Sequence, residues 1–318
     1  MTTDSTDKPM HRGMPDDFGR FIARYLPGKI QKISVNAAMP CPNRDGSKGT
    51  GGCIYCNNAS FSPAYTMKPG TIAAQLEAGK RFFARKYPRM RYLAYFQSYT
   101  STNCDIVRLR DMYQEALTVD GVDGLIIGTR PDCMPDPLLD YLSELACGKF
   151  VMVEYGAESA HDRTLAAINR CHTWADTADA VRRTAAAGIP VGLHLIMGLP
   201  DESREDMLAT IDAVNHLPVN IIKCHQLQII RGTRLAAEVE AGRIKPAQWD
   251  VDRYIDLCCA IIRRLREDIA VERFVSQCPD DMLISPRWGL KNYQFTERLR
   301  RRLQAMSDSM GSPAISML

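Results

Sequence analysis

The chain has 318 residues, of which 45% are hydrophobic and 24% are charged, and its formal net charge is +3. This length suits one large α/β barrel or two ordinary domains, and the composition is that of a soluble globular protein. The small net charge neither favours nor excludes nucleic acid as a partner, and no apolar run approaches the roughly 18 residues of a membrane-spanning helix.

The chain begins with a polar stretch and then alternates between strand-like and helix-like segments. Residues 1–15 lack the apolar core of a signal peptide and are predicted to be a disordered lead. The strand-like runs are mostly continuously apolar, as in strands that a parallel sheet buries on both faces. The predicted strands are Ile30–Val35, Tyr92–Gln97, Gly124–Gly128, Phe150–Tyr155, Val191–Met197 and Ile221–Leu227. The predicted helices between them are Ile72–Tyr87, Ile106–Leu117, Pro137–Ala146, Thr173–Ala187 and Arg204–Leu217.

This alternation predicts an α/β fold built as a partial, TIM-like barrel of six strand–helix units. We expect the barrel to span residues 16–230 and to carry a mainly helical C-terminal extension, residues 231–318, packed against it. Within this extension Asp252–Ile269 is amphipathic. The segment Lys291–Gln304 carries four arginines, which form either a solvated helix face or an edge that contacts phosphates.

Glycine or polar residues follow most of the predicted strands. In barrels of this kind the functional residues gather at the carboxyl ends of the strands, so these segments are expected to form one rim. A fold that needed only stability would have no reason to concentrate polar groups there. The segments are Gln97–Thr100, Thr129–Asp132, Glu154–Ser159 and Met197–Pro200.

The first predicted strand is followed by three cysteines, Cys41, Cys53 and Cys56. Thiolates are soft, anionic ligands for iron, and three of them on a [4Fe-4S] cluster (cluster loop 41–56) leave one iron open for chemistry. The glycine-rich span Gly49–Gly52 lets the backbone pass close to such a cluster. A structural zinc site is the alternative, and it needs a fourth ligand such as Cys104 or a histidine. The other cysteines are expected to be ordinary buried thiols, and eleven cysteines without an export signal favour a reducing cytoplasm.

Further short motifs carry a resemblance that extends over almost the whole chain. The matching stretches are Cys41–Gly46, Gly51–Asn57, Gly128–Asp132, Glu154–Gly156, Ile168–Arg170 with His172, His194–Pro200, Lys223–His225 and Trp288–Asn292. In this order they resemble radical S-adenosylmethionine (SAM) enzymes. More narrowly, they resemble the bacterial YhcC/YtqA-type family, whose radical domain is related to that of the Elongator catalytic subunit. The long gap between Cys41 and Cys53 is typical of this narrower family. Cys171 replaces a glycine of its pattern, and is either tolerated or a redox-active extra thiol.

The resemblance implies a partial radical SAM barrel in which Cys41, Cys53 and Cys56 bind a [4Fe-4S] cluster. SAM would bind the open iron, and reductive cleavage would give a 5′-deoxyadenosyl radical that abstracts hydrogen from a substrate. It also implies a one-electron reductant of the flavodoxin or ferredoxin type. The substrate stays open, and kinship to the Elongator subunit suggests transfer RNA. A binding protein that keeps zinc or a cluster without catalysis is the alternative.

The resemblance also assigns roles to residues of the rim, although each polar side chain could instead have a purely structural role. Tyr55 and the segment Ile196–Gly198 are expected beside the adenine of SAM. The residues expected to hold its amino, ribose and carboxylate groups are Gln97, Ser98 and Thr100, then Glu158 and Ser159, and finally Arg170. Those that could face the substrate are Arg130, Asp132, Lys223 and His225.

Overall fold

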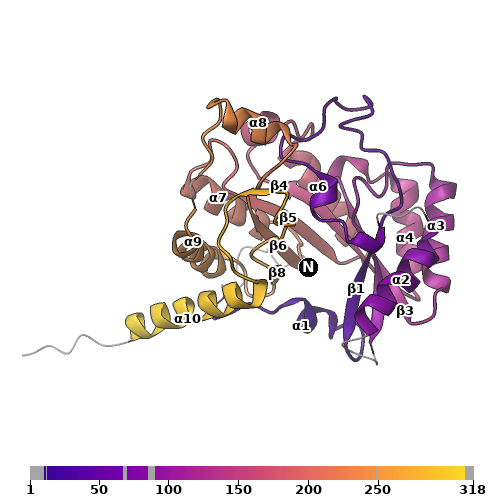
Figure 1. Cartoon of the computed structure of the whole chain (residues 1–318). Coiled ribbons are helices and arrows are strands. Elements are labelled where there is room, and N and C mark those ends of the chain that lie inside the picture. The colour runs from indigo at the N-terminus through magenta and orange to yellow at the C-terminus, as the bar shows by residue number, and fades with distance from the viewer. Residues whose placement is uncertain (1–10, 12, 67–69, 85–89, 248, 312–318) are drawn as a thin grey trace, which may run out of the picture.

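The computed structural model describes residues 11, 13–66, 70–84, 90–247 and 249–311 (Figure 1). Most of the predicted disordered lead, residues 1–10 and 12, therefore lies outside the described residues. Within that lead, His11 is buried, and its backbone N–H donates to the carbonyl oxygen of Leu265 at 3.2 Å. None of the helices formed by the described residues combines the length and apolar character that a bilayer crossing requires.

Seven parallel strands form one sheet that curls into a half-barrel (Figure 1), so the predicted partial barrel is confirmed. Along the sheet they are β1 (Ile30–Val35), β2 (Arg91–Phe96), β3 (Val122–Thr129), β4 (Phe150–Glu158), β5 (Val191–Met197), β6 (Ile221–Gln226) and β8 (Ala270–Arg273). The seventh strand, β8, was not predicted, because it follows directly on the amphipathic segment Asp252–Ile269. The helix there ends at Arg264, so the predicted C-terminal extension contributes a strand to the sheet.

Within the described ranges, seven helices pack in the core on the outside of the half-barrel. They are α2 (Ile72–Ala84), α3 (Ile106–Thr118), α4 (Asp136–Ala146), α6 (Trp174–Ala186), α7 (Arg204–Asn215), α9 (Val251–Arg264) and α10 (Asn292–Gly311). Two others, α5 (Asp162–Ala167) and α8 (Arg234–Glu240), belong to a separate apolar cluster with Ile54 and Ile196. The sequence sets their starts, since α6 and α7 each begin with a capping box, from Thr173 with Asp176 and from Ser203 with Asp206. Shorter elements are α1 (Phe18–Ile22), η2 (Asn58–Ser60), η3 (Ala64–Thr66), η4 (Pro131–Cys133) and the antiparallel ribbon of β7 (Ile229–Ile230) with β9 (Leu283–Ser285).

The two faces of the sheet are filled differently. The outer face packs under the helices in a large apolar core, whereas the inner face is apolar mainly toward the amino-terminal ends of the strands. There α1 closes the half-barrel with Phe21 and Ile22, which pack against Leu93, Ile126 and Met152. Because side chains alternate along a strand, the inward positions that follow these residues are free to carry polar groups at the carboxyl-terminal rim.

Candidate active site

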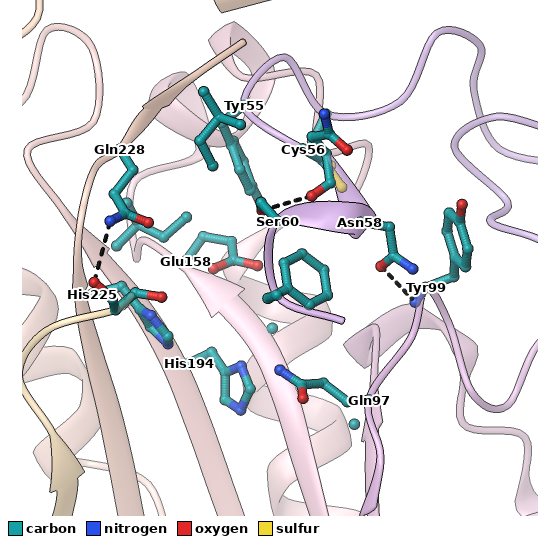
Figure 2. A pocket seen from close by; sticks show the side chains of 18 of the residues that line it. Tyr55, Cys56, Asn58, Ser60, Gln97, Tyr99, Glu158, His194, His225 and Gln228 are labelled. Atoms are coloured by element: carbon teal, nitrogen blue, oxygen red, sulfur yellow. Dashed lines mark hydrogen bonds between the residues drawn. The ribbon is translucent and has the colours of Figure 1, made fainter. Parts of the chain in front are cut away.

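One pocket opens at the carboxyl ends of the strands and receives all three cysteines of the predicted cluster loop, Cys41, Cys53 and Cys56. We call it the rim pocket. Figure 2 shows Tyr55 and Cys56 above the side chains of Glu158, His194 and His225, which come from neighbouring strands. The order of the strands thus brings together residues that lie far apart in the sequence.

The turn between Cys53 and Cys56 is fixed to two helices. Cys56 donates its backbone N–H to the carbonyl of Cys53 at 3.1 Å, which closes the turn. Ile54 is buried between them; its N–H donates to the carbonyl of Ile168 at 3.1 Å, and its own carbonyl accepts from Leu235 at 2.8 Å. Ile168 follows α5 and Leu235 lies in α8, so the two sulfur atoms are held from both sides.

The loop before this turn is held by a pair of asparagines. The buried Asn43 donates to the backbone carbonyl of Asn169, and Asn169 donates to the carbonyls of Thr50 and Gly52 at 3.0 and 2.8 Å. The side chains of Asn43 and Arg44 approach the backbone of this loop so closely that two positions require glycine. A Cβ atom at Gly49 would lie 2.6 Å from Asn43 Oδ1. Gly52 has φ +74°, and a Cβ atom there would lie 2.8 Å from a side-chain nitrogen of Arg44.

The sulfur of Cys53 has two hydrogen-bond donors, Asn43 Nδ2 at 3.5 Å and an amino nitrogen of Arg170 at 3.6 Å. Arg170 also donates to the carbonyl of Gly156 at 2.6 Å and pairs with Glu158 at 3.3 Å, while its buried Nε has no partner in the part of the chain that the structure describes. Burial, followed by the neighbouring Cys53, raises the pKa of the Cys56 thiol to about 11. A metal must therefore displace a proton from this thiol when it binds.

These residues fit a cluster better than a single ion. Within the described part of the chain, no three His, Cys, Asp or Glu side chains come close enough to hold one metal ion. A four-iron cube has separate corners for its thiolates, so its ligands lie farther apart than those of one tetrahedral zinc. Soft donors, hydrogen bonds to a sulfur atom, close-packed glycines and the free Nε of Arg170 all match this larger group.

Most of the residues predicted to bind SAM line the rim pocket. They are Tyr55, Gln97, Thr100, Glu158, Arg170 and Ile196. Ser98, Ser159 and Gly198, all within the described residues, lie outside its lining. Ser159 donates to Glu202 Oε1 at 2.5 Å, and the N–H of Gly198 donates to Met207 Sδ at 3.1 Å.

The four residues expected to face the substrate separate into different places. His225 lines the rim pocket. Arg130 and Asp132 form a buried ion pair at 2.9 Å, which Lys48 joins at 2.9 Å from Asp132, and neither Arg130 nor Asp132 is in the lining among the described residues. Lys223 is almost fully buried and donates to Tyr95 Oη at 3.0 Å.

Lys223 belongs to an ionic cluster that the sequence did not indicate. Glu154, only 1% exposed, accepts from Lys223 at 2.5 Å, from Lys32 at 3.0 Å and from His194 at 2.9 Å. Glu272 on β8 pairs with both lysines. Although burial alone would raise the pKa of Glu154, Lys223 and Lys32 hold it well below its usual value. Burial lowers the pKa of Lys223 to about 8 against the pull of both carboxylates.

Two further charged residues of the rim pocket, Arg44 and Arg273, were not predicted. Arg44 lies in the cluster loop, where its guanidinium donates to the carbonyl of Cys56 at 3.0 Å. Arg44 lies within the matching stretch Cys41–Gly46, and an arginine between ligating cysteines is a signal that indicates a role at the cluster. Arg273 ends β8, the strand that the sequence did not reveal, so no signal pointed to it.

Comparisons with known proteins show which family the chain matches. The model of the Radical SAM superfamily matches residues 46–214, and that of the Radical_SAM C-terminal domain matches residues 219–305. Protein YhcC of Escherichia coli K12 is 37% identical over 272 residues, which cover 85% of this chain and 86% of YhcC. Protein YtqA of Bacillus subtilis 168 is 31% identical over 290 residues, which cover 91% of this chain and 89% of YtqA.

Among solved structures, archaeal Elp3 of Methanocaldococcus infernus with an N-terminal deletion matches 90% of this chain with a TM-score of 0.62. The match covers 64% of that longer chain at 16% identity, so it concerns the fold alone. Members of the radical SAM superfamily are enzymes that bind a [4Fe-4S] cluster and SAM. The family models and the two relatives cover most of the chain, which belongs to the radical SAM superfamily and, within it, to the family of YhcC and YtqA.

Proposed function

We propose that this enzyme holds its [4Fe-4S] cluster with Cys41, Cys53 and Cys56 and cleaves SAM reductively on the open iron. The observation that carries the proposal is that the three cysteines share the rim pocket with side chains from the strand ends. When bound, the cluster supplies one electron to the sulfonium of SAM, which yields methionine and a 5′-deoxyadenosyl radical that takes a hydrogen atom from the substrate.

The chain's own residues would orient SAM and exclude water from it. Arg170 can offer its unpartnered Nε to the carboxylate of SAM, next to the sulfur of Cys53. Glu158 is a suitable acceptor for ribose hydroxyls, whereas Ser159 would have to exchange its bond to Glu202 for that role. The remaining proposed contacts are Gln97, Ser98 and Thr100 to the amino group, and Tyr55, Ile196 and Gly198 around adenine.

The partners of the reaction follow from the same chemistry. A flavodoxin or ferredoxin would supply the electron, and a reducing compartment such as the cytoplasm suits a chain in which all eleven cysteines are free. Transfer RNA is a proposed substrate on the strength of the kinship to the Elongator subunit. His225 faces the rim pocket and is proposed to meet the substrate, whereas Arg130, Asp132 and Lys223 are already engaged in buried ion pairs.

The test is cluster assembly followed by SAM cleavage in the absence of oxygen. The wild-type protein, reconstituted with iron and sulfide, should absorb broadly near ~400 nm, bind about four irons and release 5′-deoxyadenosine after reduction with SAM present. Alanine in place of Cys41, Cys53 or Cys56 should abolish cluster loading. Alanine in place of Cys104, which does not line the rim pocket, should leave loading intact.

Two results would count against the proposal. A colourless protein that binds one zinc ion would favour the structural zinc alternative. A fully loaded and reduced cluster that forms no 5′-deoxyadenosine, even with RNA and small-molecule fractions added, would leave a binding protein without catalysis.

A further inference from the structure

A second pocket meets the rim pocket inside the half-barrel. We call it the side pocket; it lies between β1 and β8, the two edge strands of the sheet, and Lys32 and Glu272 form an ion pair across its wall. The two pockets share three lining residues, Tyr95, Gln97 and Arg273. Arg273 therefore stands where a molecule that fills one pocket would reach the other.

The charged side chains that the strands carry at this junction balance except for one. Lys32 and Lys223 are each shared between Glu154 and Glu272, so two cations face two anions. The two histidines add no charge, because burial lowers the pKa of His194 and lowers that of His225 far below its usual value. Among the described residues Arg273 has no carboxylate within ion-pair distance, which leaves its positive charge unbalanced.

The guanidinium of Arg273 also has unused hydrogen-bonding capacity. Among the described residues its buried Nε has no hydrogen-bond partner, and the only hydrogen bond of its side chain is a long one, 3.5 Å from an amino nitrogen to Nε2 of His225. The wall beside it is built firmly, because Gln226 both donates to the carbonyl of Ser276 at 3.1 Å and accepts its N–H at 2.9 Å. A partly buried cation in a fixed wall, with donors to spare, is costly unless an anion completes it.

We propose that Arg273 binds an anionic group of the substrate, a phosphate or a carboxylate, at the junction of the two pockets. The proposal rests on the function proposed above and names the chemistry of its substrate. A planar guanidinium binds either anion through paired hydrogen bonds. The side pocket adds the rings of Tyr65 and Phe82, which pack on each other, and the cation Arg81, so the rest of the substrate can lie against an aromatic surface.

The experiment uses the wild-type enzyme and its variants with matched cluster content, at constant ionic strength in chloride. The thermal midpoint is followed during titration with inorganic phosphate and, separately, with malonate. A ligand that binds only the folded protein raises the midpoint in a saturable way. R273Q should weaken the anion affinity roughly 10- to 100-fold, the effect of losing hydrogen bonds to a charged group. R273K keeps the positive charge but lacks the paired donors of a guanidinium, so its anion affinity should lie between those of the wild type and R273Q.

R253Q is the matched control, because Arg253 is exposed and lies outside both pockets; its response should equal that of the wild type. A response to phosphate alone identifies a phosphate ester, and a response to malonate alone identifies a carboxylate. Equal affinities of the wild type and R273Q, or no saturable response in the loaded wild type, would overturn the proposal. So would loss of the response when SAM is bound, since Arg273 would then belong to the carboxylate of SAM. Failure of the proposed function would appear separately, as wild-type protein without cluster or 5′-deoxyadenosine.

Discussion

Replacing Glu154 with glutamine tests whether the ionic cluster inside the half-barrel is needed for stability. Glu154 is 1% exposed and accepts from Lys32, Lys223 and His194. The amide would keep the shape, but it would turn an NH2 group toward donors and leave one positive charge unbalanced.

Breaking a buried ion pair by removing one partner costs about 3–5 kcal/mol. We take about 3 kcal/mol, because the amide oxygen still accepts one hydrogen bond. With an unfolding entropy of about 2.1 cal/mol/K per residue, 318 residues give about 0.67 kcal/mol/K, so the midpoint should fall by about 4 to 5 °C. The double variant E154Q/K32M restores the balance between Lys223 and Glu272. Its loss of unfolding free energy should be smaller, by about 0.5–3 kcal/mol, than the sum of the losses of E154Q and K32M measured singly.

The assay is thermal unfolding of the four proteins at matched cluster content, across a range of pH. In the wild type the folded pKa of Lys223 is about 8, below that of the unfolded chain. Without Glu154 the pKa of Lys223 in the folded state falls further. Below pH 8 only the variant therefore loses the ammonium proton of Lys223 when it folds. The stability of E154Q should therefore rise with pH and its deficit should shrink as pH 8 is approached. An E154Q midpoint within 1 °C or so of the wild type, or strictly additive losses, would refute the reasoning.

Two further substitutions test the cluster loop and the pair beside it. G49A places a Cβ atom 2.6 Å from Asn43 Oδ1, at a packing cost of about 1–3 kcal/mol, and should lower the iron and sulfide bound per chain. G148A is the control: a Cβ atom there meets nothing within 4 Å, so this variant should bind as much iron and sulfide as the wild type. D132N should lower the free energy of unfolding in urea at pH 7 by about 2 kcal/mol, because Arg130, against the opposing effect of burial, helps to bring the pKa of Asp132 to about 2. That loss should narrow as the pH falls from about 4 toward 2, and a loss independent of pH would contradict the assignment.

The half-barrel was accessible from the sequence because local signals and the fold agree. Apolar strands, capped helices and polar strand ends are each determined by short stretches of residues. The bounds of six predicted strands agree with the observed ones to within a few residues. The cysteine spacing was equally local. The short edge strand β8 has no such signal, since Glu272 and Arg273 are charged and the strand follows a helix without a clear break.

The pairing inside the half-barrel could not be predicted, because it joins strands that are distant in the sequence. Lys32, Glu154 and Lys223 lie on β1, β4 and β6, and only the curl of the sheet brings them within hydrogen-bond distance. Propensity and periodicity contain no information about that curl. The same holds for Arg170, whose bond to the sulfur of Cys53 spans 117 positions.

A usable signal was nevertheless present in the strands themselves. Lys223 and His225 alternate with Cys224, which is fully buried in the core beneath the helices. Since side chains alternate between the faces of a strand, a single charge in an apolar strand of a helix-covered sheet must point inward. Inward charges share a small space, so acids and bases there must nearly cancel. On β8 a register shift against Ile222 and Lys223 lets the adjacent Glu272 and Arg273 both line the inside of the half-barrel. The two lysines then pair with Glu154 and Glu272, and Arg273 is left without a carboxylate. Because the positive charge of Arg273 is left unbalanced by the protein, we assign its anionic partner to the substrate.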